Sequence, residues 1–187
     1  MSWIYKYWAK IGGILACGII LFVLFSGMKP TDIKALLWFH FSILLLHQFE
    51  EYIFPGGFQD FFDKTIQDKN LLKVSLNDKG VILVNIVLGW TAYFLSAISG
   101  ARILWLAVGI LGITISNGMI HTIMFIIKRR YVPGVITGLL LFIPFGIYVL
   151  LKILEISTIK DVISGILVFI IGTASIPITI LITGKKS

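Results

Sequence analysis

The chain has 187 residues, of which 58% are hydrophobic and only 13% are charged, and its formal net charge is +7. Average globular chains are about 45–50% apolar and about 25% charged, so this composition excludes a soluble globular domain and a disordered chain. The single cysteine, Cys17, excludes an intrachain disulfide scaffold. The composition therefore predicts an integral membrane protein.

Six apolar runs are long enough to cross a bilayer, which takes roughly 20 helical residues. None of them alternates between polar and apolar residues, so each is predicted to be a helix. The first run lacks a small-residue cleavage site, and we interpret it as a span rather than a signal peptide. The sequence thus predicts an all-α integral membrane protein, a polytopic bundle of about six transmembrane helices forming one domain over residues 1–187. The predicted spans are Ile11–Gly27, Ile33–Phe49, Val81–Ser99, Ile103–Ile127, Val135–Leu151 and Val162–Thr183.

An even number of spans places both termini on one side of the membrane. Of the 16 Lys and Arg residues, 11 are expected on the side of the termini and 5 on the other side. The positive-inside rule then predicts a multi-pass protein of the plasma membrane with both termini in the cytoplasm. This orientation, with attraction to anionic lipid head groups, accounts for the net charge. Membrane lipids are the expected partners, nucleic acid is not, and no protein partner can be inferred.

Aromatic residues mark the expected ends of two spans. Trp3, Tyr5, Tyr7 and Trp8 precede the first span, and Tyr131 follows the fourth. Amphipathic rings favour the head-group layer of a bilayer. We therefore expect these residues to be interface anchors.

The long connection over residues 52–80 is predicted to contain an amphipathic helix. Phe58, Phe61, Phe62 and Ile66 follow the spacing i, i+3, i+4, i+8 after the turn Phe54-Pro55-Gly56-Gly57. Such a helix is expected to lie in the cytoplasmic membrane interface. It is either a structural cover over the end of the bundle or a lid over a site.

The second span contains ionisable residues, each of which costs roughly 2.5–3.5 kcal/mol near the centre of a bilayer. Because a helix turns about 100° per residue, His40, His47 and Glu51 form one stripe, predicted to face inward. Glu50 lies about 60° to the other side of His47, and Phe49 is expected to face lipid.

Two further spans carry polar residues at a similar depth. Asn117 and His121 are four residues apart on one face of the fourth span, and Asn85 begins a face of small residues in the third. The predicted topology brings these groups to the cytoplasmic end of the bundle. A site is therefore predicted there.

The run His47-Gln48-Phe49-Glu50-Glu51, at the end of a hydrophobic span, resembles the motif of the HXXEE family of prokaryotic membrane proteins. The length and the multi-span layout are also similar to that family. The resemblance implies an integral membrane protein of uncharacterised activity and indicates no substrate.

Two histidines and a carboxylate with open positions suit catalytic zinc or non-haem iron. We therefore predict that His47, Glu50, Glu51 and His121 bind one zinc or iron ion, with no organic cofactor. Glu50 and Glu51 are also the predicted catalytic residues, and Asn85 and Asn117 are predicted to orient the substrate. The expected substrate is a lipid ester or amide from the cytoplasmic leaflet, turned over by a hydrolase or an oxidoreductase.

Three other interpretations stay open. His47 oriented by Glu51 suits metal-free acid–base or acyl-transfer chemistry, although no serine nucleophile lies beside it in the sequence. Intramembrane His and Glu residues also serve proton or ion transport. A purely structural role, with the carboxylates solvated at the interface, is the third.

Overall fold

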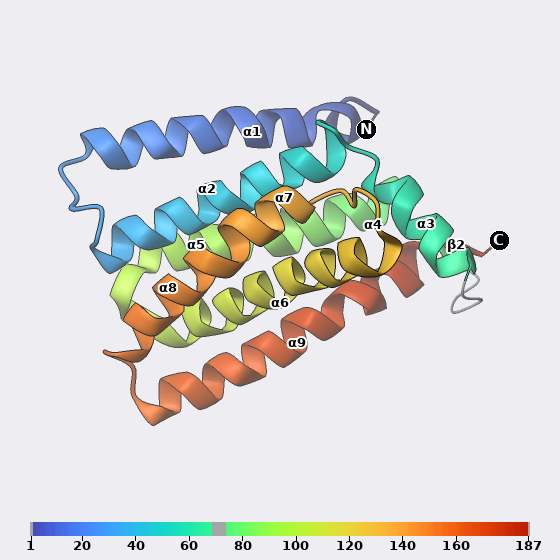
Figure 1. The fold of residues 1–187 in the computed structure, drawn as a ribbon. Helices are drawn as coiled ribbons and strands as arrows, with labels where there is room; N and C mark the ends of the chain where they lie inside the picture. The colour runs from blue at the N-terminus through green and yellow to red at the C-terminus, as the bar shows by residue number, and fades with distance from the viewer. Residues whose placement is uncertain (1, 69–73, 187) are drawn as a thin grey trace.

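The computed structural model describes residues 2–68 and 74–186, which form a bundle of long helices (Figure 1). The chain is helical over most of its length because long apolar segments satisfy their backbone hydrogen bonds internally, as hydrocarbon requires. Short helices and π-helical turns (η1 and η3) interrupt two of the spans. The elements are α1 Ser2–Phe25, α2 Ile33–Tyr52, α3 Phe58–Asp68, β1 Val74–Ser75, α4 Asp78–Ile82, η1 Leu83–Trp90, α5 Thr91–Ser99, η2 Gly100–Arg102, α6 Leu104–Lys128, α7 Val135–Thr137, η3 Gly138–Phe142, α8 Ile143–Leu154, α9 Ile159–Thr183 and β2 Lys185–Lys186.

The prediction of an all-α membrane bundle is confirmed. Five helical segments of the described chain are long and apolar enough to cross a membrane, and each overlaps one predicted span. Their ends differ from the prediction by a few residues, and the first begins eight residues earlier than predicted. The segments are Trp3–Phe25, Asp78–Arg102, Leu104–Lys128, Val135–Leu154 and Ile159–Thr183.

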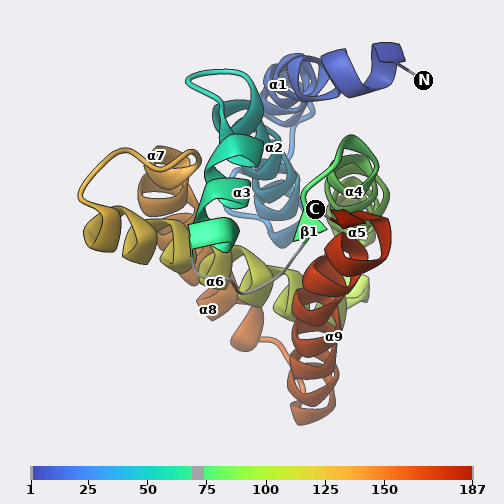
Figure 2. The same cartoon turned by 90° about the vertical axis from the view of Figure 1, so that its right-hand side faces the viewer.

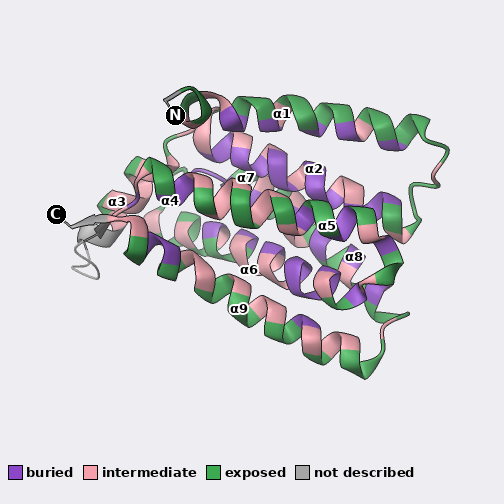
Figure 3. Cartoon of the chain, turned by 180° about the vertical axis from the view of Figure 1, so that it is seen from behind, coloured by how far each residue is buried: buried purple, intermediate pink, exposed green. Residues whose placement is uncertain are grey.

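The remaining predicted span is helix α2, which lies inside the bundle. Its 20 residues have a length of about 30 Å, the thickness of the bilayer hydrocarbon. It contains more polar residues than its neighbours, among them His40, His47 and Glu51. These residues are buried inside the bundle and do not face lipid. Figure 3 shows this burial along α2, whereas α1 and α9 expose much of their surface at the outside of the bundle.

Both termini lie at the same end of the bundle as α3 (Figures 1 and 2). Strand β1, which follows α3, pairs antiparallel with the C-terminal strand β2. The predicted turn and amphipathic helix of the 52–80 connection are present, with α3 beginning at Phe58. Residues 69–73, which include two lysines counted in the orientation prediction, lie outside the described residues.

Two aromatic residues pack inside the bundle, contrary to the sequence prediction. Trp8 is only 5% exposed, and its ring lies 4.9 Å from that of Tyr52, so it is a core residue and not an interface anchor. Phe49 packs against α1, where a Cβ atom on Gly13 would lie 2.7 Å from its ring. The prediction that Phe49 faces lipid is wrong because α1 covers that side of α2.

Helix α8 is preceded by the π-helical turn η3. Pro144 has no backbone N–H, so it cannot complete the α-helical hydrogen bond to the carbonyl of Leu140. Wider π turns are a common accommodation and occur frequently at functional sites. This turn follows directly on α7, which forms part of the site described below.

A polar contact in the middle of the bundle joins α2, α5 and α6. Thr114 Oγ1 lies 2.7 Å from Nε2 of His40 and 2.5 Å from the hydroxyl of Tyr93, and it donates to the carbonyl of Ile110 at 3.0 Å. Because the hydroxyl has one proton and donates it to Ile110, its oxygen accepts a hydrogen bond from each of the two side chains. All three side chains are buried, so their pairing is required in this apolar layer.

The substitution Thr114→Val is expected to lower the free energy of unfolding by about 1–3 kcal/mol, because it leaves His40 and Tyr93 without their shared partner. Thermal or denaturant unfolding of the purified protein in detergent measures this loss. Thr122→Val is the control, because its hydroxyl donates to the Gly118 carbonyl of its own helix. Equal losses for the two variants would show that the interhelical contact adds no stability.

Candidate metal centre

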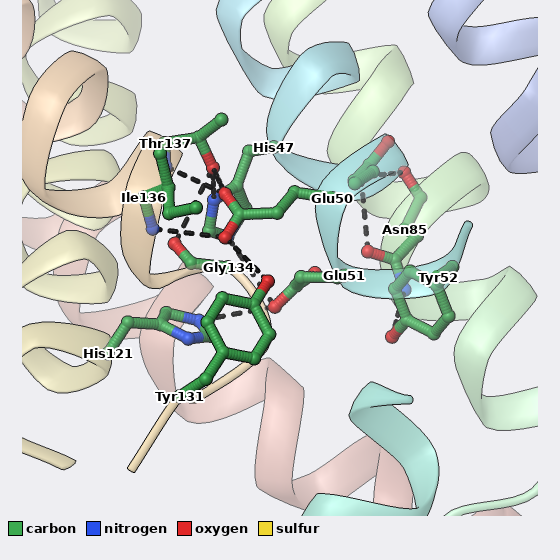
Figure 4. Close-up of polar contacts among 11 residues, drawn as sticks. His47, Glu50, Glu51, Tyr52, Asn85, His121, Tyr131, Gly134, Ile136 and Thr137 are labelled. Atoms are coloured by element: carbon green, nitrogen blue, oxygen red, sulfur yellow. Dashed lines mark hydrogen bonds and ion pairs between the residues drawn. The ribbon is translucent and has the colours of Figure 1, made fainter. Parts of the chain in front are cut away.

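Three of the predicted site residues meet where α2 passes α6. The ring nitrogens Nε2 of His47 and His121 lie 3.5 Å and 3.2 Å from the same oxygen, Oε1 of Glu51 (Figure 4). The side chains of His47 and Glu51 lie one helical turn apart on α2, and His121 faces them from α6. The three residues are 2%, 5% and 4% exposed, respectively, so the group is removed from solvent.

The spacing of this group fits a metal ion. One ligand atom from each residue lies within 4.8 Å of the other two. Tetrahedral zinc with bonds of about 2.0–2.1 Å places its ligands about 3.3 Å apart. The two histidine-to-Glu51 distances, 3.5 Å and 3.2 Å, bracket that value. The geometry therefore allows one ion with three protein ligands and a vacant coordination position for water or substrate.

Glu50 was predicted both as a ligand and as a catalytic residue, but the structure places its oxygens elsewhere. Its Oε1 accepts from the Tyr131 hydroxyl at 2.8 Å and from the Ile136 N–H at 3.0 Å. Its Oε2 accepts from the N–H of Thr137 at 2.7 Å and from the hydroxyl of the same residue at 2.5 Å. Four donors use the lone pairs of an ionised carboxylate, so Glu50 holds the start of α7 in place and has no lone pair left for an ion.

The same contacts determine the tautomer of His47. Nδ1 of His47 lies 2.8 Å from Oγ1 of Thr137. The threonine proton is donated to the Glu50 carboxylate, which can only accept, so Nδ1 of His47 must be the donor in this contact. The lone pair of the neutral imidazole is then on Nε2, the atom that faces Glu51. Metal-binding histidines are commonly oriented in this way through a hydrogen bond from their other nitrogen.

The group has unused hydrogen-bonding capacity. Nε2 of His47 and Nδ1 of His121 are buried and have no hydrogen-bond partner among the described residues. Phe142 covers the other face of His47, with ring centroids 4.1 Å apart. A buried carboxylate between two imidazoles needs a compensating positive charge, which either a bound cation or protonation of an imidazole supplies.

Gly134 closes one side of the group. It has a φ of +88°, and a Cβ atom built on it would lie 2.8 Å from Cε1 of His47 and 2.9 Å from Cε1 of His121. It would also lie 3.0 Å from Cγ of Glu51. Glycine is therefore required here both by the backbone conformation and by the close approach of the backbone to the three side chains.

The other side of the group opens on a small cavity, called here the Glu51 cavity. It has a volume of about 100 Å³, room for a few water molecules. Helix α3 covers it with Phe58 and Phe62, and the ring of Phe58 lies 5.9 Å from that of His121. The amphipathic helix is thus the cover of this cavity. Its lining is Glu51, Tyr52, Phe58, Phe62, Leu76, Val81, Val84, Asn85, Asn117, Ile176 and Ile180.

The two predicted substrate-orienting asparagines both line the Glu51 cavity, but they differ in their contacts. Asn85 accepts from Gln48 at 3.1 Å and donates to the carbonyl of Val81 at 2.9 Å, so its amide joins α2 to the α4–η1 segment. Oδ1 of Asn117 is buried and has no hydrogen-bond partner in the part of the chain that the structure describes. Of the two, Asn117 is the one with an unused polar atom.

Tyr131 lies in the loop between α6 and α7 and is a site residue, although it was predicted only as an interface anchor. Desolvation, together with its hydrogen bond to the Glu50 carboxylate, raises the pKa of Tyr131 well above its ordinary value. The phenol therefore stays protonated and remains a donor to Glu50.

Sequence reasoning also missed Thr137 and the role of Gly134. A threonine at the start of an apolar span carries no signal of its own. Gly134 and Gly138 have the G-x-x-x-G spacing of a helix-packing motif. Gly138 does pack closely, since a Cβ atom there would lie 3.3 Å from Cα of Gly118. His40, which shares a stripe with His47, bonds Thr114 and is separate from the group.

The comparisons with known proteins identify one family. The family described as "Protein of unknown function with HXXEE motif" matches residues 38–149. The matched segment contains His47, Glu50, Glu51, Asn85, Asn117 and His121, and also Gly134 and Thr137. No curated protein and no solved structure matches the chain.

The substitution Gly134→Ala is expected to push His47 and His121 apart and to lower the free energy of unfolding by about 1–3 kcal/mol beyond the backbone strain. Gly57→Ala is the matched control, because Gly57 has a φ of +91° but nothing within 4 Å of its Cβ position. Unfolding of both variants in detergent separates steric contact from strain. Equal destabilisation would mean that Gly134 does not confine the group.

Proposed function

The chain belongs to the HXXEE-motif family of proteins of unknown function, and we propose that this member is a metal-dependent membrane enzyme acting on a lipid-like substrate. The observation that carries the proposal is the convergence of His47 Nε2, His121 Nε2 and Glu51 Oε1 within metal-binding distance in a buried group. The hydrogen bond of His47 to Thr137 supports it, because it leaves the lone pair of the imidazole facing the other two ligands.

The reaction that suits this donor set best is hydrolysis of a lipid ester or amide. A zinc ion held by His47, His121 and Glu51 would supply Lewis acidity toward a carbonyl and a water with a pKa of about 7. In the reaction, a water oxygen bonds to the carbonyl carbon, and the bond from that carbon to the alcohol or amine group breaks. One proton of the water goes to the departing alcohol or amine, and the other stays with the carboxylic acid, which is the second product. The same two-histidine, one-carboxylate set also suits iron, which would favour oxidation instead.

Each residue of the site has its own role in the proposed reaction. His47, Glu51 and His121 hold the ion, and Glu50 acts as a positioning residue through Thr137. The second carboxylate oxygen of Glu51 is the proposed proton acceptor during water attack. Asn117 lines the Glu51 cavity and has an unpaired amide oxygen, so it is the proposed residue that orients the substrate.

We also propose that the site faces the cytoplasm, in a multi-pass protein of the plasma membrane with both termini inside. The positive-inside count supports this orientation, and the two termini, α3 and the site lie at one end of the bundle (Figure 1). Substrate would then come from the cytoplasmic leaflet.

One observation favours a second, metal-free candidate. The Thr137 hydroxyl lies between His47 and Glu50, at 2.8 Å and 2.5 Å, as a nucleophile beside a base would. Acyl transfer to Thr137, with Glu50 accepting its proton, is the alternative that this contact supports. It requires the hydroxyl but no metal.

The gently purified protein is expected to carry about one zinc or iron ion per chain, and His47→Ala and His121→Ala are each expected to lose it, since each removes one of three ligands. Elemental analysis of the folded protein measures the metal content. His40→Ala is the control, because this buried histidine on the same helix bonds Thr114 and not the group. Wild-type protein without metal would overturn the proposal in favour of the metal-free candidate.

Thr137→Val is expected to weaken metal binding by about 10–100-fold, because the hydrogen bond that orients His47 is lost. Thr137→Ser keeps the hydroxyl and is expected to bind metal as the wild type does. Competition titration against a chelator gives both affinities. If the valine variant binds metal normally but loses activity, Thr137 is a nucleophile rather than a positioning residue.

A cysteine at Lys64 on α3 is expected to react with a membrane-impermeant reagent only from the cytoplasmic side. A cysteine at Glu155, in the connection between α8 and α9, is the matched control and is expected to react only from outside. Both positions are exposed, and Cys17 is replaced by serine in both variants. Labelling of intact cells and of inverted vesicles measures the two sides, and the reverse pattern would overturn the orientation.

A further inference from the structure

The Glu51 cavity shares lining residues with two other cavities, one polar and one apolar. The polar one, of about 90 Å³, shares Tyr52 and Val81 with it and is also lined by Lys6, Gln59 and Asp78. The apolar one, of about 320 Å³, shares Val84 and Ile176 with it. We call this apolar cavity the α9 groove. The Glu51 cavity is therefore where a polar end of the bundle meets a lipid-facing groove.

The α9 groove is built to take a hydrocarbon chain. It lies between η1–α5, α6 and α9, all of which belong to segments long and apolar enough to span a membrane. Small residues, among them Ala92, Gly172 and Ser175, make room for it. The Ser175 hydroxyl donates to the carbonyl of Gly172 at 2.7 Å, so it is already paired. The groove therefore presents hydrocarbon to its occupant.

The Glu51 cavity, unlike the α9 groove, has polar groups among its lining residues and so favours a polar head group. Asn117 is one of the residues that line the Glu51 cavity, and its buried Oδ1 has no hydrogen-bond partner within the described segments 2–68 and 74–186. An unpaired buried acceptor is costly and is satisfied by a ligand with an N–H or O–H donor. The cavity of about 100 Å³ admits a small head group only, not the branched head of a two-chain phospholipid.

From this juxtaposition we propose the substrate class: a single-chain lipid with a small amide head group, whose chain lies in the α9 groove and whose amide lies beside Asn117 and Glu51. This inference rests on the proposed function. A primary or N-substituted fatty amide supplies both the donor for Asn117 and the carbonyl for the metal centre. Lipid reaches the site sideways, between α9 and the η1–α5 segment, and water reaches it through the polar cavity.

A second apolar groove, of about 690 Å³, serves as an internal comparison. It lies between α1, α2 and the η1–α5 segment and is lined by Leu15, Phe22 and Trp38, among others. It shares no lining residue with the Glu51 cavity. A lipid bound there contacts none of the residues that line the Glu51 cavity, so we take occupancy of this groove as the level of ordinary bilayer lipid.

The test uses the full-length protein in nanodiscs and a long-chain fatty amide that carries a diazirine at the end of its chain. After illumination, mass spectrometry of peptides is expected to place the crosslinks on α6 and α9, which line the α9 groove but not the comparison groove. Ser175→Leu and Ala92→Leu fill the groove and are each expected to reduce crosslinking by about tenfold. Thr173→Leu, an exposed position on α9 outside the residues that line the groove, is the matched control and is expected to leave crosslinking unchanged.

Replacing Asn117 tests the head-group contact. Asn117→Leu is expected to reduce crosslinking by the fatty amide to the level obtained with a methyl-ester probe, which cannot donate a hydrogen bond to the asparagine. Equal crosslinking by the two probes in the wild type would overturn the amide assignment. Equal labelling of the groove at α1 and α2, or insensitivity to both leucine variants in the α9 groove, would overturn the binding site.

The metal content of the same samples separates this inference from the proposed function. Ser175→Leu is expected to retain the metal while losing the lipid. Specific labelling of the α9 groove in a protein without metal would uphold the lipid site and refute the metal-dependent enzyme. Bound metal without specific labelling would refute the lipid site and leave the metal-dependent enzyme standing.

Discussion

The Glu50 carboxylate organises the site without taking part in the three-residue group. Its four hydrogen bonds reach Tyr131, Ile136 and Thr137, all outside its own helix. They attach the loop after α6 to the end of α2 and bring Gly134 against the histidines. Without this tie, the start of α7 would have unpaired N–H groups in an apolar layer, where each costs several kcal/mol. The rest of the site depends on that requirement.

Two adjacent glutamates therefore perform different tasks. Glu51 faces two imidazoles across the helix interface, whereas Glu50 is turned by about 100° toward the backbone of α7. A helix necessarily separates consecutive side chains in this way. Of the two glutamates in the motif, Glu51 belongs to the proposed metal-binding group. Glu50 holds Thr137, which in turn orients the imidazole of His47. Exchanging either for a neutral residue would disturb a different part of the structure.

The sequence predicts the bundle well because hydrocarbon leaves few options for a long apolar chain. Helical geometry also places His47 and Glu51 on one inward stripe, and the topology places His121 at the same depth. The contributions of Thr137 and Gly134 could not be inferred, since they depend on where an irregular loop approaches α2. The same limit applies to Trp8 and Phe49, whose surroundings are set by how α1 packs against α2.

The function remains beyond the sequence for a related physical reason. A His-x-x-Glu-Glu run specifies which donor atoms are present, but it does not specify which substrate can approach them. That depends on the shapes of the spaces between helices, which arise from many small residues on several segments. In this chain Glu51 lines one such space, which shares other residues with its two neighbours.

The C-terminal end of helix α9 is held by sheet pairing and by a side-chain hydrogen bond. Strand β2 follows directly on α9 and pairs with β1, and the side chain of Asn77 donates to the carbonyl of Thr183. Between this anchored end and the groove-lining Gly172 stands Pro177, which removes one helical hydrogen bond and marks a natural bending point. Before Pro177, α9 packs closely on α6, where a Cβ atom on Gly165 would lie 2.5 Å from Val108. A bend at Pro177 therefore lets the first part of α9 follow α6 while Ile180 lies in the wall of the Glu51 cavity.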